Sequence, residues 1–210
     1  MGVAERGLHI AEPAERENLL AFAANVLRLD AAAVIRLRRR ADGRVAAWAA
    51  TGFDVLASRV VAARLNPADA TVAADVLVGQ LRAARPDVDL GYAMDSAWRG
   101  ALPPERGFVH VDDVPARDLV DLAARGSALA QEHSSTPASL LDQEVIEVSG
   151  GGERVGVAMR MVFALVAMGF VPDEMGAEVV RVRAERNWIR LDARFGSVSK
   201  RRAGGPALLF

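Results

Sequence analysis

A two-residue Asp-Gly step at 42–43 separates two short runs in which apolar and polar residues alternate. The runs span 33–40 and 45–51, and Asp-Gly between such runs is typical of a tight β-hairpin. If the step forms a two-residue turn, Leu37 lies opposite Trp48, and this pair faces the core. The pattern therefore predicts an antiparallel sheet in this part of the chain.

The same alternation gives the hairpin a basic face. Three arginines stand two residues apart on the side away from the core: Arg36, Arg38 and Arg40. We expect this face to be partly exposed, with at least one ion pair inside the chain, to Asp54 on the next strand. If a second domain or another subunit covered the face, the acidic stretch 132–147 would supply the carboxylates that buried guanidinium groups need.

The rest of the first half completes an α-β-β-β-α order. Apolar residues at helical spacing predict helices at 13–27 and 73–84, and the segment 53–65 is expected to add a third antiparallel strand. This order matches the double-stranded RNA-binding domain. That domain begins its second helix with lysines that grip phosphate. The corresponding segment 70–75 has no lysine and contains an aspartate, which argues against duplex binding.

The second half is predicted to follow the order α-β-β-α-β-β. Pro115 opens an amphipathic helix, and two runs then flank the three glycines at 150–152, which predicts a second hairpin. An apolar helix at 158–168 ends at Gly169, a pattern typical of a glycine C-cap. Alternation over 178–195 predicts a third hairpin.

The predicted fold class is α+β. We expect two small domains, 1–100 and 101–210, each an antiparallel sheet with helices on one face. A stretch rich in proline and glycine, 85–113, forms the expected connection between them. With 210 residues, 51% of them hydrophobic, the chain can bury a core without disulfides or a metal.

Cysteine is absent from the chain, and the formal net charge is -1. The first observation excludes disulfides, thiol catalysis and cysteine-bound zinc, and it fits a cytoplasmic location. The second gives no general reason to expect nucleic acid or a membrane surface as a partner. The most apolar window, 155–171, contains Arg160 and is shorter than the roughly 20 residues that a membrane span needs. We expect no membrane association.

The sequence motifs typical of catalysis or cofactor binding are absent or incomplete in this chain. The glycines at 150–152 lack the lysine of a phosphate-binding loop and the third glycine of a dinucleotide fingerprint. His9, His110 and His133 are scattered, so no metal site is predicted. The segment 197–200 spells S-x-x-K, but it follows a strand instead of opening a buried helix. We predict no catalytic residue, no cofactor and no metal, and we favour a protein that is not an enzyme.

One acid–base constellation stays open as an alternative. His110 is followed closely by Asp112 and Asp113. Alternation along a strand would place His110 and Asp112 on the same side, within reach of each other. Asp113 would instead supply negative charge at the start of the helix that Pro115 opens. No third catalytic group can be named for this cluster.

A second basic stripe covers residues 178–202, with eight basic and three acidic side chains. Alternation along the predicted hairpin turns four arginines away from its apolar face. They are Arg181, Arg183, Arg190 and Arg194. Together with the three arginines of the first hairpin, they are the candidate phosphate-contacting residues of a nucleic-acid-binding surface. Solvated strand faces in an arginine-rich chain are the alternative. Trp98 and Arg99 are candidate surface contacts for a partner.

We interpret the chain as a protein that acts through contacts with other proteins or with copies of itself. The catalytic motifs fail, and the apolar segment 204–210 is a candidate contact with another subunit, although it can equally fold back on its own domain. Phosphate-backbone binding by the arginine faces is the alternative function. It predicts an affinity for nucleic acid that falls steeply with salt.

Four phrases in the sequence carry a family resemblance. They are WRGALPP at 98–104, LLDQEVIEVSG at 140–150, ALVAMGF at 164–170 and WIRLDARFGSV at 188–198. Together they resemble an actinobacterial family of uncharacterised two-part proteins, along nearly the whole chain. The resemblance implies a two-part architecture and brings no activity, cofactor or catalytic residue.

Overall fold

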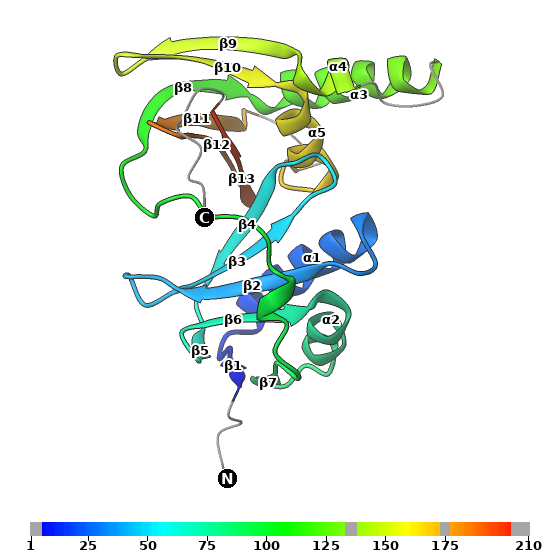
Figure 1. Ribbon diagram of the computed structural model, residues 1–210, viewed down its shortest axis with the longest axis vertical. Helices are drawn as coiled ribbons and strands as arrows, with labels where there is room; N and C mark the ends of the chain where they lie inside the picture. Colours follow the sequence, from blue (N-terminus) through cyan, green and yellow to red (C-terminus); the bar gives the residue numbers. More distant parts are fainter. Residues whose placement is uncertain (1–5, 133–137, 173–176, 203–210) are drawn as a thin grey trace. The chain divides into compact units, whose positions relative to one another are not determined.

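A computed structural model describes residues 6–132, 138–172 and 177–202 of the chain (Figure 1). His133 and the apolar segment 204–210 lie outside the described residues. The chain forms two compact units. Unit 1 comprises residues 1–52 and 56–102, and unit 2 comprises residues 53–55 and 103–210. Both are α+β, with antiparallel strand pairing and helices packed against the sheet.

Unit 1 contains a four-stranded antiparallel part of a sheet, in the order β6-β2-β3-β4. Its strands are β2 (Val34–Arg39), β3 (Val45–Ala50), β4 (Leu56–Val61) and β6 (Asp69–Ala73). A small three-stranded sheet has the order β5-β1-β7. It is made of β1 (Gly7–His9), β5 (Arg64–Asn66) and β7 (Asp87–Asp89), and a 3-10 turn, η1, covers Asp95–Ala97.

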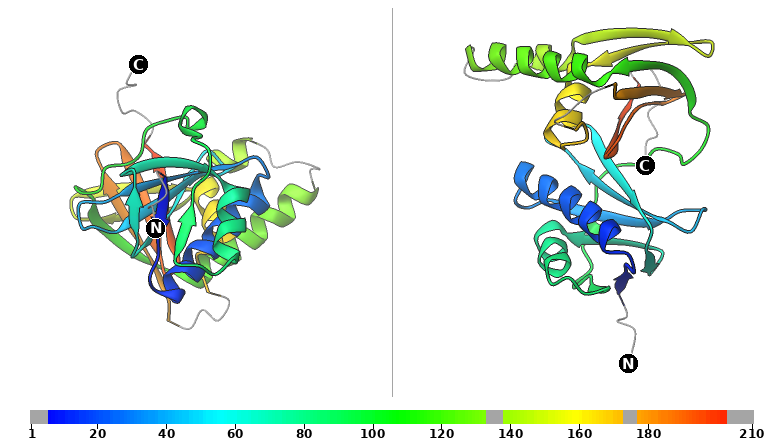
Figure 2. Two further views of the ribbon diagram at one scale, coloured as in Figure 1. Left: turned by 90° about the horizontal axis from the view of Figure 1, so that it is seen from below. Right: turned by 180° about the vertical axis from the view of Figure 1, so that it is seen from behind.

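Two helices lie side by side in unit 1, α1 (Pro13–Leu29) and α2 (Ala74–Arg82) (Figures 1 and 2). Pro13 occupies the first turn of α1, where a missing backbone N–H costs no hydrogen bond. The inner side of α1 buries Leu19 and Phe22, and the sheet buries Leu37. This apolar layer is the core that fixes the orientation of the strands, because the other face of each strand must then carry the polar residues.

The hairpin of β2 and β3 has a register one residue away from the predicted one. Arg36 lies opposite Trp48, so the predicted pairing of Leu37 with Trp48 is wrong. The turn has three residues, 41–43, because the N–H of Arg40 donates to the carbonyl of Arg44 over 2.8 Å. Gly43 ends this turn at φ 81°, the left-handed conformation that a three-residue hairpin requires and that glycine adopts without strain.

Unit 2 contains an antiparallel sheet in the order β13-β12-β11-β8 and a separate two-stranded hairpin, β9-β10. The sheet strands are β8 (Val109–Pro115), β11 (Val179–Glu185), β12 (Trp188–Ala193) and β13 (Gly196–Arg201). The hairpin strands are β9 (Glu144–Gly150) and β10 (Glu153–Ala158). The helices are α3 (Ala116–Glu132), α4 (Ala138–Asp142) and α5 (Met159–Ala167).

Helix α5 forms the centre of the unit 2 core. It is buried almost all round, and it packs against the apolar sides of β12 and β13. Gly169 follows α5 at φ 64°, and the N–H of Phe170 donates to the carbonyl of Leu165, which confirms the predicted glycine C-cap. The Phe170 ring then rests on Gly196, where an added β-carbon would lie only 2.4 Å from the ring.

The structure contains strands that alternation did not predict. Strand β8 begins inside the stretch 85–113 and continues to Pro115. The stretch shows no sustained period there because a bulge at Val111 interrupts the alternation of the strand. Strand β13 carries the S-x-x-K string and has only Val198 as a large apolar residue, so pairing with β12 defines it. No helix in the described part of the chain is long and apolar enough to cross a membrane.

Candidate functional site

Two of the three arginines on the basic face of unit 1 share one aspartate, Asp69. Arg36 donates from Nε and Nη2 to the two carboxylate oxygens of Asp69, both over 2.8 Å. This bidentate pair raises the pKa of Arg36 above its usual value, mainly through the side-chain hydrogen bond. Arg38 Nε lies 3.9 Å from the same carboxylate. Asp69 lies on β6 directly opposite Arg38, so sheet pairing brings the charges together.

Asp54 is not the partner of this face, and the expectation that it would be is wrong. Asp69 pairs with Arg36 and Arg38, and Asp42 in the hairpin turn lies 3.1 Å from Arg40 Nε. In the described part of the chain, the carboxylates that pair with these arginines come from Asp69 and Asp42 and not from the stretch 132–147. Asp54 belongs to unit 2, where its carboxylate lies 3.6 Å from Arg160. Asp69 and not Asp54 meets these arginines because β6 pairs with β2. Strand alternation carries no information about which strands pair.

Trp98 is engaged within unit 1. Its ring lies beneath the Arg36 guanidinium, 5.9 Å from the ring centroid, and its Nε1–H donates to the carbonyl of Gly100 over 3.0 Å. The ring therefore supports the Arg36–Asp69 pair from one side. The neighbouring Arg99 is exposed. Whether Trp98 and Arg99 contact a partner stays a prediction.

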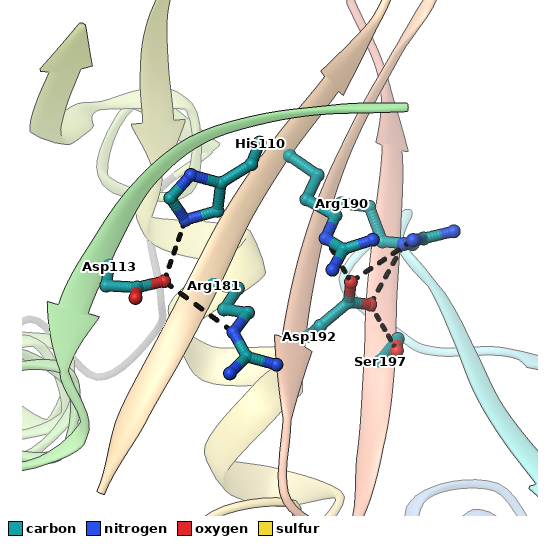
Figure 3. Close-up of polar contacts among 7 residues, drawn as sticks. His110, Asp113, Arg181, Arg190, Asp192 and Ser197 are labelled. Carbon is teal, nitrogen blue, oxygen red and sulfur yellow. Dashed lines mark hydrogen bonds and ion pairs between the residues drawn. The ribbon is translucent and has the colours of Figure 1, made fainter. Parts of the chain in front are cut away.

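A network around Asp192 organises the arginine face of unit 2 (Figure 3). Asp192 lies on β12. Its carboxylate is 2.9 Å from Arg190 Nε and 3.2 Å from Arg183 Nε. Ser197 on β13 donates its hydroxyl to the same carboxylate over 2.6 Å. Three strands therefore meet at one acidic side chain, which is 23% exposed.

His110 pairs with Asp113, whereas strand alternation predicts Asp112 at this position. Strand β8 pairs with β11. His110 lies opposite Arg183 of β11, and Asp112 lies opposite Val182, so Val111 between them is an extra residue in β8. This bulge reverses the alternation and turns His110 and Asp113 to one face. His110 Nε2 is 2.9 Å from Asp113 Oδ1, so the predicted pairing with Asp112 is wrong. Figure 3 shows the two side chains pointing toward each other.

Gly150 and Gly151 have a packing role next to this bulge. A β-carbon on Gly150 would lie 2.0 Å from the carbonyl oxygen of Val111, and one on Gly151 would lie 2.8 Å from that of His110. The end of the β9-β10 hairpin therefore approaches β8 backbone to backbone, which only glycine allows. The serine and lysine of the S-x-x-K segment contact other groups and not each other. Ser197 donates to Asp192, and Lys200 donates to the backbone of Arg201 over 3.5 Å.

Every arginine that the sequence nominates for phosphate contact lies within 4.0 Å of a carboxylate in its own unit. The two nominated arginines of unit 2 not yet described are Arg181 and Arg194. Arg181 Nε is 3.9 Å from Asp113, and Arg194 pairs with Glu178. The arginines form two groups, one in each unit. The key acids, Asp69 and Asp192, were not nominated from the sequence. For Asp192 the alternation with Arg190 on one strand face is a usable sequence signal.

Aromatic rings lie against several cations on unit 2. The Arg190 guanidinium lies 4.2 Å from the ring centroid of Phe108, and Arg201 lies 5.4 Å from that of Trp188. A third contact, between Arg194 and its neighbour Phe195, spans 5.8 Å. Among the described residues, no three histidine, aspartate or glutamate side chains gather in a way that could hold a metal ion.

Comparison with known proteins supports the two-part architecture. Residues 3–100 match the model of a domain of unknown function, DUF8010, and residues 103–205 match a second domain of unknown function, DUF8185. No curated protein sequence matches the chain. Solved structures are more informative about the fold. The fold is similar to that of a sliding clamp.

The matched structures include bacterial DNA polymerase sliding clamps. A clamp from Caulobacter crescentus aligns with a TM-score of 0.57 and 15% identity, over 98% of this chain and 66% of that chain. A clamp from Bacillus subtilis aligns with a TM-score of 0.61 and 11% identity, over 96% and 65% of the two chains. The chain thus spans about two thirds of the clamp chains it matches, and the likeness describes the clamp-like fold alone.

Proposed function

We propose that this protein acts by binding other proteins, and that its first partner is a second copy of itself. The observation that carries the proposal is an exposed aromatic side chain on unit 1. Tyr92 is 94% exposed, and the adjacent Gly91 packs near Val76 of α2, which is itself 38% exposed. Exposed tyrosines beside aliphatic side chains are typical anchors of protein interfaces.

The charge distribution supports a protein partner over a polyanion. Each of the seven nominated arginines has a carboxylate within 4.0 Å, which weakens the basic field on both sheets. The exposed charges that the structure describes on α1, α2 and α3 also balance. On α1 and α2 they are Glu17, Arg28, Asp75 and Arg82, and on α3 they are Arg117, Asp118, Asp121 and Arg125. A surface of this kind has little net attraction for a phosphate backbone.

Light scattering after size exclusion tests the proposal over a series of protein concentrations. We expect a mass at least twice the 22.4 kDa of the chain at the highest concentration. Tyr92→Ser should shift the equilibrium toward monomer, whereas Arg85→Gln, an exposed change in the same unit, should not. A chain ending at Arg202 tests the segment 204–210 in the same way. A monomeric mass at every concentration would contradict the proposal.

A second candidate function is nucleic-acid binding, and the contacts of aromatic rings with arginines on unit 2 favour it. Two arginines of unit 2 lie on aromatic rings, Arg190 on Phe108 and Arg201 on Trp188. Cationic and aromatic side chains are the types that contact single-stranded nucleic acid. The similar solved proteins are also sliding clamps of DNA polymerases. In this function the phosphates would compete with Asp192 and Glu178 for the guanidinium groups.

Fluorescence anisotropy with labelled single-stranded and double-stranded DNA tests this second function. Binding through the arginine face of unit 2 predicts an affinity that falls steeply as salt rises, because each neutralised phosphate releases counterions. Arg181→Gln should weaken binding, since Arg181 is 57% exposed and is the least tightly paired of the four. The absence of binding at low salt would exclude this function.

A further inference from the structure

Two arginines face each other across neighbouring strands of unit 2. In the β11-β12 pair Arg183 lies directly opposite Arg190, and on the other side of β11 it lies opposite His110 of β8. Like charges placed directly opposite each other destabilise a sheet unless a counter-ion lies between them. This row of the sheet therefore depends on an anion.

The protein supplies one carboxylate for the two guanidinium groups. Asp192 lies next to both, and it also accepts the hydroxyl hydrogen bond of Ser197. Among the residues that the structure describes, no second carboxylate pairs with Arg183 or Arg190. One negative charge therefore serves two fixed positive charges, which leaves a local excess of positive charge.

Arg190 donates from Nη2 to Asp192 over 3.1 Å, but three other polar atoms of this row have no aligned hydrogen-bond partner among the described residues. The Nε atoms of Arg183 and Arg190 are buried and close to Asp192, yet neither makes a well-aligned hydrogen bond to a described residue. Ser199 lies opposite Arg190 on β13, is 1% exposed, and its Oγ has no hydrogen-bond partner in the described part of the chain. Buried polar groups in this state are uncommon, and a bound anion or water is the usual partner of such groups.

We propose that Arg183, Arg190 and His110 form a binding site for a phosphate group. The site is open to solvent, because the side chains of Arg183 and Arg190 are 34% and 19% exposed and that of His110 is 52% exposed. A guanidinium offers a fork of N–H donors that fits phosphate oxygens, and phosphate carries up to two negative charges. A phosphate there would neutralise the excess charge that Asp192 leaves. The inference does not depend on self-association of the chain.

Isothermal titration with inorganic phosphate at constant ionic strength tests the site. We expect saturable binding with one site per chain. Arg183→Gln and Arg190→Gln should each weaken it by about tenfold, since each removes a charge-assisted contact. Arg154→Gln is the matched control, because Arg154 is a 73% exposed arginine of the same unit paired with Glu147, and it should leave binding unchanged.

Asp192→Asn makes the test two-sided. It removes the competing carboxylate and retains the shape of the side chain, so phosphate binding should become tighter. The circular dichroism spectrum of each variant shows whether it is folded. Arg183→Lys, which retains the charge, should restore part of the affinity and covers the case in which the glutamine variants do not fold. No saturable binding to the parent protein, or weaker binding to folded Asp192→Asn, overturns the proposal.

The source of the phosphate group is decided by two further ligands. A short single-stranded DNA that competes with inorganic phosphate identifies the nucleic-acid backbone as a source, whereas phosphate binding without such competition identifies a small phosphorylated ligand. Acetate at the same ionic strength is the control for simple charge. Acetate binding as tight as phosphate binding would overturn the assignment in favour of a carboxylate site.

Discussion

Arg160 Nη1 donates a 2.9 Å hydrogen bond to the backbone carbonyl of Phe53. The arginine is the second residue of α5, and its side chain is only 12% exposed. Its other contacts are with Asp142 and Asp54, and the Phe53 ring stacks on Phe163 at a centroid distance of 5.9 Å. The segment 53–55, which lies between β3 and β4 in the sequence, is thereby held within unit 2.

Replacing Arg160 with methionine should therefore destabilise unit 2 by about 1–3 kcal/mol, because the part-buried Phe53 carbonyl loses this hydrogen bond and Asp142 loses its ion pair. Urea unfolding followed by circular dichroism measures the change. Asp54→Asn is the control. The Asp54 side chain is 91% exposed, so its loss should cost less than about 0.5 kcal/mol. Equal losses in the two variants would show that the Phe53 carbonyl contact carries little energy.

Gly150→Ala should destabilise the protein by about 1–3 kcal/mol, because the new β-carbon overlaps the Val111 carbonyl and must push the hairpin from β8. Thermal unfolding provides the measurement. Gly79→Ala in α2 is a matched control, since no atom lies within 4 Å of the added carbon. Alanine also favours helix, so this control should stabilise the protein by up to about 1 kcal/mol. A neutral Gly150→Ala would mean that the hairpin is free to move from β8.

The Arg36–Asp69 pair should show measurable coupling energy. Both hydrogen bonds are short, and Arg36 is 29% exposed, so we expect a coupling of about 1 kcal/mol after allowance for solvent screening. A double-mutant cycle with Arg36→Gln and Asp69→Asn measures it from urea unfolding. Arg39→Gln, on the exposed end of β2, should change stability little. A coupling near zero would assign the pair to the solvated surface.

The hairpin turn should show a pH dependence that comes from Asp42. The backbone N–H of Arg44 holds the pKa of the Asp42 carboxyl below its usual value, with a smaller contribution from Arg40. Because the folded-state pKa is lowered, this contribution to stability is present above the unfolded pKa and is lost as the pH falls through the folded pKa. Carboxyl NMR titration measures it, and in Arg40→Gln the pKa should stay below its usual value.

Strand alternation was sufficient for much of the fold of each unit. The runs around Asp-Gly at 42–43 and the glycines at 150–152 predicted hairpins that the structure contains, because a pleated strand must alternate its faces when one side is buried. The helix that opens at Pro13 and the C-cap at Gly169 were also predictable. Both depend on interactions within a few residues, which the local sequence encodes.

The register errors show the limit of the local argument. One additional turn residue set the register of the first hairpin, since a three-residue turn places Trp48 opposite Arg36. Asp-Gly is compatible with turns of two or three residues. The bulge at Val111 similarly gave His110 the partner Asp113. In both places backbone pairing with another strand fixed the geometry. Alternation along one strand does not predict an extra residue in a turn or a bulge.

The sequence alone determined that Leu37 faces the core and that Arg36 and Arg38 stand together on the other side of the strand, because burial and the two-residue period act along the chain itself. It placed Trp48 on the wrong face, since that choice depends on the register. Only the tertiary structure decided what those arginines meet. Asp69 reaches Arg36 because β6 pairs with β2, and Asp192 reaches Arg183 because β11 pairs with β12. Charge interactions depend on distance in space, and strand pairing joins residues that are far apart in the sequence.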